Sequence, residues 1–445
     1  MEKDGAKPMT RVHVLPLDDE RKIVYCPDAM RFFVAKADLI PLIRQVANGA
    51  DLDDLNAKGF SITDRQLNGL REKLGGVHVR SVGCPPAGQL PRLVLNISND
   101  CNMRCKYCYA NCGDYGGQRG LMSVDTLTRA LDYFCSRYQE IAVIQLFGGE
   151  PTLNMPAIRL ACEYFIDKRQ NPKIGFVTNG VIVNDELLSL IKRFDLNVTV
   201  SIDGKSFQDR LRPFPGDSAS WDRVHRNVLR LLEATGQPSQ FELTYTQVHE
   251  DEQCSIVELI EELRKEFGDI PVHVTPVCST DPQFELNSTQ AFVDAVDDVY
   301  DARKDGKNDS FALLAGLESC LKYKVASEYL CNAGFGTLSV STFGDIYPCF
   351  YFTDRAGYRA ANVRDEFDSI DLALRRMREK YSAMRKRALP ECIRCFANTV
   401  CHSCLGANLD TTGDPFRSSV SSCAMTRKML ERLLVRLALR VEKEG

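Results

Sequence analysis

Apolar and polar residues recur along the chain with two distinct periods. Between residues 92 and 277, short runs in which apolar or β-branched residues alternate with polar ones are separated by longer stretches with apolar residues every three or four positions. The short runs predict strands and the longer stretches predict amphipathic helices. We expect strands at 92–98, 141–147, 173–179, 196–203, 241–247 and 271–277, and helices at 123–138, 184–193, 221–235 and 256–267.

This succession of strands and helices predicts the fold class. Repeated βα units form a parallel sheet with helices outside, so six units predict an α/β protein with a partial barrel over residues 89–280. In such folds the functional residues lie at the C-terminal ends of the strands. Functional residues are therefore expected just after each predicted strand.

The region before the barrel has a different order of elements. Residues 1–88 contain three short alternating runs followed by stretches with helical spacing, which predicts a few strands and then helices. This order resembles a small winged-helix module. The segment 81–91 is rich in proline and glycine and predicts a linker to the barrel.

The βα pattern stops after about residue 280. Two helical stretches predict a helical bridge over residues 281–330, and residues 331–445 form a cysteine-rich region with short strands and a closing basic helix around 427–440. We expect this last region to be a domain of its own.

Composition narrows the class of protein. With 445 residues and 44% hydrophobic content, the chain has ample material for a packed core. No run approaches the roughly 20 apolar residues of a membrane helix, and the N-terminus lacks the apolar core of a signal peptide, so we expect a cytoplasmic protein without a membrane partner. A net charge of -4 offers no bulk attraction to phosphate backbones, so no nucleic-acid partner is expected.

The 18 cysteines are the outlying feature of the composition. In a cytosolic chain of this size, clustered cysteines bind metal more often than they form disulfides. Cysteines outside any cluster are usually small buried hydrophobes. Seven belong to this isolated class: Cys26, Cys84, Cys112, Cys135, Cys162, Cys254 and Cys278.

The first cysteine cluster follows the first predicted barrel strand. Cys101, Cys105 and Cys108 have the spacing C-x3-C-x2-C, and three thiolates on one loop can hold three irons of a [4Fe-4S] cluster. The fourth iron then stays open for a chelating ligand. A zinc loop is the weaker alternative because structural zinc takes four ligands, and we do not expect Cys112 to supply the fourth.

This motif after the first strand of a βα barrel resembles the signature of the radical S-adenosylmethionine (SAM) superfamily. Later strand ends fit the same resemblance: residues 148–151 resemble the GGE motif, residues 201–204 the SxDG stretch, and residues 209–212 the HDxxR motif, with Gln208 in place of histidine. The resemblance implies that Tyr107 lies beside the adenine and that Arg212 pairs with the SAM carboxylate. The implied SAM contacts are Tyr107, Gly148, Gly149, Glu150, Asn179, Ser201, Asp203 and Arg212.

The C-terminal cysteines resemble the SPASM extension of radical SAM enzymes, which binds two auxiliary [4Fe-4S] clusters. One gap, between Cys401 and Cys404, has two residues where the family commonly has three. The resemblance assigns Cys331, Cys349 and Cys404 to the first auxiliary cluster, with Cys320 as a candidate fourth ligand. It assigns Cys392, Cys395, Cys401 and Cys423 to the second. A double zinc ribbon is the competing interpretation.

The combined resemblance implies an oxidoreductase with three [4Fe-4S] clusters and SAM. SPASM enzymes with a winged-helix module resemble maturases of ribosomally made peptides, in which the module binds a leader peptide by adding it as a strand. We therefore expect a precursor peptide as the substrate. The expected product is a crosslinked peptide, and the preferred crosslink is a cysteine thioether. The enzyme would also need an electron donor such as flavodoxin or ferredoxin.

Several alternatives remain at this point. A sulfatase-maturing enzyme would have an aspartate after Cys349, where this chain has Phe350. A peptide epimerase or a C–C crosslinking enzyme has motifs that cannot be told apart from those of a thioether former. An iron–sulfur or zinc sensor that binds DNA would need a basic face, and residues 1–88 have nearly balanced charge.

Overall fold

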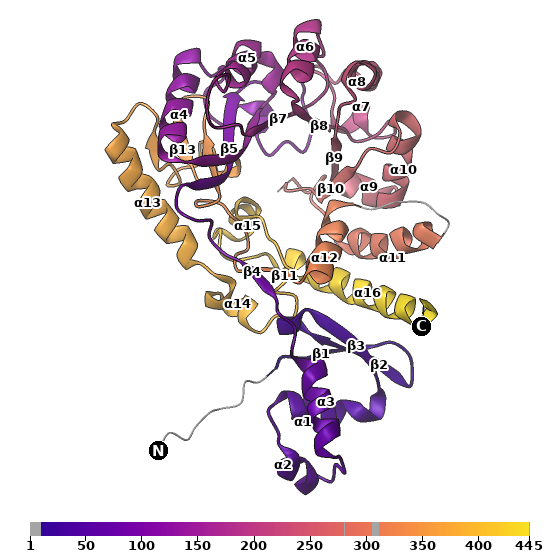
Figure 1. The fold of residues 1–445 in the computed structure, drawn as a ribbon. Coiled ribbons are helices and arrows are strands. Elements are labelled where there is room, and N and C mark those ends of the chain that lie inside the picture. Colours follow the sequence, from indigo (N-terminus) through magenta and orange to yellow (C-terminus); the bar gives the residue numbers. More distant parts are fainter. Residues whose placement is uncertain (1–9, 280, 305–310, 445) are drawn as a thin grey trace.

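A computed structural model describes residues 10–279, 281–304 and 311–444 (Figure 1). The chain begins with an antiparallel sheet in the order β1-β2-β3, followed by three helices. Val24, Ile43, Leu55 and Leu67 belong to a separate hydrophobic core in this module. The predicted order of strands before helices is thus observed. The elements are β1 (His13–Pro16), β2 (Arg21–Cys26), β3 (Arg31–Lys36), α1 (Ile40–Ala47), α2 (Leu52–Ala57) and α3 (Asp64–Leu74).

The central sheet contains the six predicted parallel strands in sequence order, from β5 to β10. Helices connect the strands and cover the outer face of the sheet (Figure 1), so the α/β partial barrel is confirmed. The strands are β5 (Gln89–Ser98), β6 (Glu140–Gly148), β7 (Lys173–Thr178), β8 (Asn197–Ser201), β9 (Gln240–Tyr245) and β10 (Val272–Pro276). The helices are α4 (Val124–Arg137), α5 (Met155–Glu163), α6 (Asp185–Phe194), α7 (Gln208–Leu211), α8 (Trp221–Thr235), α9 (Gln247–Asp251) and α10 (Ile256–Phe267).

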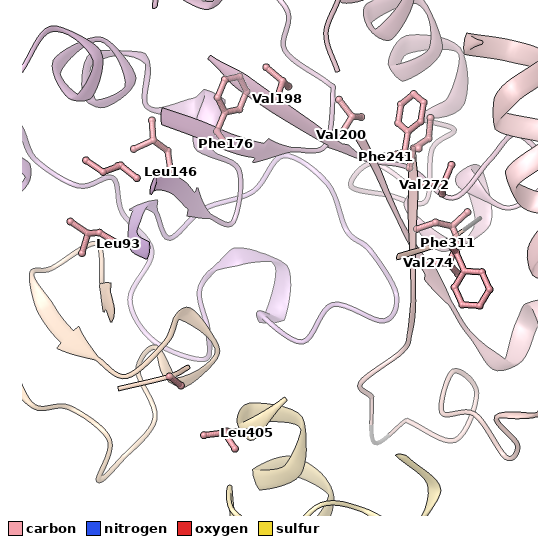
Figure 2. Packing of buried hydrophobic residues seen from close by; sticks show 14 of the residues in the cluster. Leu93, Leu146, Phe176, Val198, Val200, Phe241, Val272, Val274, Phe311 and Leu405 are labelled. Atoms are coloured by element: carbon pink, nitrogen blue, oxygen red, sulfur yellow. The ribbon is translucent and has the colours of Figure 1, made fainter. Parts of the chain in front are cut away.

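The alternation of residues along the strands explains this packing. In β8, Val198 and Val200 are fully buried, whereas Thr199 and Ser201 on the opposite face are only half-buried. Figure 2 shows Leu146, Phe176, Val198 and Phe241 on successive strands of the buried face. The other face carries polar residues such as Gln145, Thr199 and Glu242 together with apolar ones such as Val143 and Val177.

The C-terminal region continues the barrel sheet. Strand β12 (Thr337–Val340) pairs in parallel with β5, with Ser339 opposite Val94, and the antiparallel strands β13 (Asp345–Tyr347) and β14 (Ala361–Asn362) extend the same sheet. The result is a mixed sheet of nine strands. Short strands were predicted here, but their pairing with the barrel was not.

The segment predicted as a linker is partly regular structure. Its first residues belong to β4 (Arg80–Val82), which pairs in parallel with β11 (Val325–Ser327), and β5 begins inside it. The linker prediction was therefore wrong at both ends, because strand partners far along the chain outweigh the local proline and glycine content.

The remaining helices connect these parts. Helix α16 contacts α11 on one side and strands β2 and β3 on the other (Figure 1). No helix within the described ranges is both long and apolar enough to cross a membrane. The helices are α11 (Gln290–Lys304), α12 (Ala312–Tyr323), α13 (Phe367–Ala383), α14 (Pro390–Ile393), α15 (Leu405–Thr412) and α16 (Val420–Glu444).

The N-terminal module contacts the cysteine-rich region through Arg11, which precedes β1, and through His13 in β1. The Arg11 guanidinium donates to the carbonyls of Ile393 and Cys395 at 3.1 and 3.2 Å. The His13 ring stacks on Phe396 with centroids 3.6 Å apart. The module therefore contacts the loop that carries the Cys392 and Cys395 pair.

Candidate active site and cysteine sets

The first cysteine loop follows β5 and is held by the segment that carries Arg212. The Arg104 N–H donates to the Pro213 carbonyl at 2.8 Å, and the Lys106 N–H donates to the Leu211 carbonyl at 2.9 Å. The backbone of the loop is thus anchored on both sides of Arg212, which brings its guanidinium to the cysteines.

The thiols of this loop are withdrawn from solvent. Burial raises the pKa of Cys101 to about 11 and of Cys105 to about 12, and it also raises the pKa of Cys108. A buried thiol stays protonated unless a cation compensates its thiolate, and a bound iron–sulfur cluster supplies that compensation. The donor set therefore fits a cluster of iron ions.

Two buried polar residues, Asp203 and Arg212, meet the half-buried Tyr107 of this loop. The Tyr107 hydroxyl donates to Asp203 Oδ2 at 2.6 Å, and the Arg212 guanidinium donates to the Tyr107 oxygen at 3.0 Å. Burial raises the pKa of Asp203, and the nearby Arg212 charge opposes that rise. Sequence resemblance gave Tyr107 a place beside adenine; in the structure it bridges the carboxylate and the guanidinium.

Two atoms of this trio lack a partner. Asp203 Oδ1 and Arg212 Nε are buried and make no hydrogen bond within the described structure. An unsatisfied buried polar group costs about 1–3 kcal/mol, more when it is charged, so such atoms mark the place of a missing polar ligand. The amino acid end of SAM offers a carboxylate and an ammonium that match them.

The two glycines at the end of β6 are required by the backbone where β5 leads into the cysteine loop. A Cβ on Gly148 would lie 2.1 Å from the Ser98 carbonyl oxygen, and one on Gly149 would lie 2.3 Å from that of Asp100. The sequence suggested that these glycines let a ligand approach the backbone. The structure gives a second reason, because the backbone of the loop already fills the space.

Gly148→Ala should therefore displace the first cysteine loop, and Gly148 also has a positive φ of 138°. We expect the reconstituted variant to lose about four irons per chain, as one [4Fe-4S] cluster fails to form. A matched control is Gly216→Ala, since Gly216 also has positive φ but has open space around its Cβ position. Iron analysis that finds both variants fully loaded would contradict this account.

Glu150 ties the ends of two strands together. Its Oε1 accepts hydrogen bonds from both the amide and the hydroxyl of Thr152 and from the hydroxyl of Thr178, and its Oε2 accepts one from the Asn179 N–H at 2.7 Å. The Asn179 amide in turn donates to Asn102 Oδ1 at 2.8 Å and lies 3.7 Å from Cys101 Sγ. This network fixes the ends of β6 and β7 against the cysteine loop.

The substitution of glutamine for histidine at position 208 is accommodated by hydrogen bonds. Gln208 Oε1 accepts from the Asp203 N–H at 3.0 Å, and its amide donates to the Ser220 hydroxyl at 3.2 Å. Sequence reasoning gave Gln208 no role, yet it holds the backbone of Asp203. Ser201, at the end of β8, is half-buried and has no recorded side-chain hydrogen bond in the described residues.

The C-terminal cysteines gather in two sets. Burial is the main cause that raises the pKa of Cys349 above its ordinary value, and the neighbouring Cys331 and Cys404 raise this pKa further. In the other set, burial raises the pKa of Cys392 to about 11, followed by the charges of Cys401, Cys423 and Cys395. The structure thus brings together the residues assigned to each auxiliary cluster. In the described ranges no three His, Cys, Asp or Glu side chains are grouped closely enough to hold a single metal ion.

Cys320 lies near Lys386, which is surrounded by cysteines of the second set. The charge interaction recorded for Cys320 is with Lys386, and Lys386 also interacts with Cys392, Cys395 and Cys401. Its helix, α12, therefore presents it toward the second set, and the structure gives no support for Cys320 as a ligand of the first.

Sequence reasoning missed a polar cluster at the end of β10. The Cys278 thiol lies 3.8 Å from Asp410 Oδ2, and Arg355 forms a two-point ion pair with Asp410. Tyr351 stacks on Tyr109 of the cysteine loop, with ring centroids 4.7 Å apart. Cys278 was expected to be a buried hydrophobe, and no spacing in the sequence connects it with residues more than 70 positions away.

Polar side chains of the strands line a cavity inside the barrel. The cavity has a volume of about 370 Å³, and its walls include Arg92, Gln145, Thr199, Glu242 and His273. Its walls also include Lys173, Asn197 and Gln240, the first residues of β7, β8 and β9, so the cavity lies toward the N-terminal ends of the strands, away from the cysteine loop.

Known proteins resemble this chain in both sequence and fold. Residues 95–272 match the radical SAM superfamily. An uncharacterized protein of Methanocaldococcus jannaschii is 35% identical over 133 residues, which are 29% of this chain and 45% of that protein. The radical SAM cyclopropyl synthase TigE of Paramaledivibacter caminithermalis is 26% identical over 159 residues, 33% of this chain and 32% of that protein. The chain therefore spans less than half the length of each of these two relatives.

Two solved structures show the same fold over most of the chain. The protein anSMEcpe with bound AdoMet superposes with a TM-score of 0.66 at 15% identity, covering 80% of this chain and 96% of that one. Streptococcus suis SuiB bound to S-adenosylmethionine has a TM-score of 0.54 at 16% identity and covers 94% of this chain and all of its own. The α/β core and the C-terminal extension are thus arranged as in these structures.

Proposed function

We propose that this enzyme, whose residues 95–272 form a radical SAM domain, modifies a precursor peptide. The observation that carries the proposal is the pairing of two features at the strand ends. Three half-buried thiols lie on one loop, and the unpartnered atoms of Asp203 and Arg212 lie near them. Such a site fits a chelating, zwitterionic ligand next to an iron–sulfur cluster.

The residues divide the work of holding these groups. Cys101, Cys105 and Cys108 would ligate the cluster, and Arg212 and Asp203 would bind the carboxylate and amino end of SAM. When bound, SAM and the cluster supply a radical able to take a hydrogen atom from an unactivated carbon. The protein's own residues orient these groups and exclude water, and Asn179, Glu150 and Gly148 would keep the cysteine loop in place.

The N-terminal module would bind the leader of the peptide. Strand β3 pairs with β2 on one side, and no other strand is recorded at its second edge in the described residues. An extended peptide can add to such an edge through main-chain hydrogen bonds.

We propose a cysteine thioether as the product. The first set contains three cysteines, Cys331, Cys349 and Cys404, and would leave a fourth position for the thiolate of a substrate cysteine. One structure of anSMEcpe contains both AdoMet and the Cp18Cys peptide, and it superposes with a TM-score of 0.64 at 16% identity. Three [4Fe-4S] clusters, a cytoplasmic location and an electron donor such as flavodoxin or ferredoxin belong to the same proposal.

A second candidate is formylglycine formation of the sulfatase-maturing type. Phe350 stands where that reaction needs an aspartate. The Asp410 carboxylate, however, lies near Tyr351, which is two residues after Cys349. Epimerisation and C–C crosslinking use the same first hydrogen abstraction. The mass change of the product distinguishes these reactions.

The test begins with anaerobic reconstitution. We expect about twelve irons per chain, no zinc, and release of 5′-deoxyadenosine from SAM after dithionite reduction. Candidate precursor peptides, starting with short cysteine-rich ones encoded nearby, are then screened by mass spectrometry for the loss of two hydrogens that a thioether requires. Bound zinc, or fully loaded protein that leaves SAM intact, would overturn the proposal.

A further inference from the structure

Lys386 is a buried lysine in the middle of the second cysteine set. It is 4% exposed, and its ammonium donates to the carbonyls of Asn398 and Cys401 at 2.7 and 2.5 Å. Its charge interactions, apart from burial, are with the thiols of Cys401, Cys392, Cys320 and Cys395. In the described part of the chain no carboxylate is recorded as its ion-pair partner.

Such a lysine is costly without a nearby anion. The effective penalty for burying an ammonium is several kcal/mol, and carbonyl dipoles offset only part of it. Neutral thiols contribute no negative charge, whereas thiolates bound to a metal cluster do. The charge of Lys386 is therefore balanced only when the neighbouring cysteines carry negative charge.

Arg11 is a second cation near the same loop, and unlike Lys386 it has a carboxylate partner among the described residues. Arg11 donates to the Cys395 carbonyl at 3.2 Å, but it also forms an ion pair with Asp28 at 2.5 Å. Its charge is thus largely cancelled by its own partner. Arg427 acts on Cys423 of the same set but is only half-buried. Lys386 is more deeply buried than either arginine, and its charge acts on Cys392, Cys395 and Cys401.

We infer that Lys386 is the charge-compensating residue of the second cysteine set and raises the reduction potential of the cluster held by Cys392, Cys395, Cys401 and Cys423. The potential of an iron–sulfur cluster depends on the net charge and hydrogen bonds around it. Reduction adds one negative charge, and a buried ammonium stabilises that charge. This inference rests on the proposed function, because it requires a cluster at this set.

The test compares the wild type with two variants of Lys386 by potentiometric titration followed by electron paramagnetic resonance. Lys386→Gln keeps donors for the two carbonyls but removes the charge, and Lys386→Arg keeps the charge. At the wild-type midpoint potential we expect Lys386→Gln to be at least about tenfold less reduced at this cluster, which is 59 mV for one electron. Lys386→Arg should stay close to the wild type.

A matched control is Lys324→Gln. Lys324 is half-buried, donates to the Met30 carbonyl at 2.6 Å, and lies outside the cysteine sets. It should leave the potential unchanged. Equal potentials in fully loaded wild type and Lys386→Gln would overturn the inference, whereas wild-type protein without iron would instead overturn the proposed function.

A second measurement needs no loaded cluster. In chelator-stripped protein the uncompensated ammonium destabilises the fold, so Lys386→Met should raise the melting temperature above that of stripped wild type. If Lys386 only holds the two carbonyls, the variant should instead melt lower, and that result would contradict the charge role even if the loaded variants could not be prepared.

Discussion

The triple variant of Cys101, Cys105 and Cys108 to alanine should lose all detectable SAM cleavage. It should also lose about four irons per chain and keep about eight, because the two C-terminal sets are untouched. The three thiols come from one loop after β5, whose backbone is hydrogen-bonded to Leu211 and Pro213 on both sides of Arg212. Iron and sulfide analysis and a 5′-deoxyadenosine assay measure both effects.

Cys112→Ala is the matched control for this variant. Cys112 lies on the same loop, but it meets Cys108 through its backbone N–H, at 3.2 Å from the sulfur, and not through its thiol. Full iron content and SAM cleavage are expected. If Cys112→Ala were as inactive as the triple variant, Cys112 would have to be counted among the ligands.

Arg212→Gln should weaken SAM binding by tenfold or more and destabilise the protein by about 3–5 kcal/mol. Both effects follow from the loss of the guanidinium charge. The protein is destabilised because Asp203, which is fully buried, loses its cationic partner. SAM binding is weakened because the SAM carboxylate loses a bidentate donor. Thermal unfolding and equilibrium dialysis with labelled SAM measure the two losses separately.

Arg210→Gln is the control for Arg212→Gln. Arg210 is two residues away, about half-exposed, and paired with Glu252 at 2.5 Å on the surface. Exposed ion pairs contribute at most about 1 kcal/mol, so SAM binding and stability should change little. Adding Asp203→Asn to Arg212→Gln should restore part of the stability, since the orphaned charge is gone, without restoring SAM binding. A double variant no more stable than the single one would show that the charge pair is not the cause.

The barrel was predictable because its signals are local. Strand β8 alternates Val198 and Val200 with Thr199 and Ser201, and this alternation identifies a half-buried strand without knowledge of its neighbours. The cysteine loop was predictable for the same reason, since three ligands fall within eight residues. Both were found where the patterns placed them.

Features that depend on contacts between distant parts of the chain could not be predicted from local sequence patterns. Strand β12 has four residues and pairs with β5 across more than 240 positions, so nothing near it reveals its partner. Lys386 stands between Arg385 and Arg387, a run that is typical of a solvated surface. Only the fold shows that the middle residue of this run points into the cysteines.

The glycines illustrate a partial success. Positions 148 and 149 were expected to need glycine, and they do, but the nearest obstacles are the carbonyls of Ser98 and Asp100. A sequence pattern can show that a side chain is not tolerated without showing what excludes it.

The continuous nine-stranded sheet limits how this chain can be re-engineered. A fragment that ends before Thr337 would leave the outer edge of β5 without the strand that covers it, and uncovered edges of this kind promote aggregation. Chimeras that exchange the cysteine-rich region between related enzymes should therefore take their junction upstream of β12 and carry β12, β13 and β14 as one piece. Grafts joined in the middle of the sheet would inherit mismatched registers, and directed evolution of hybrids would first have to repair that seam.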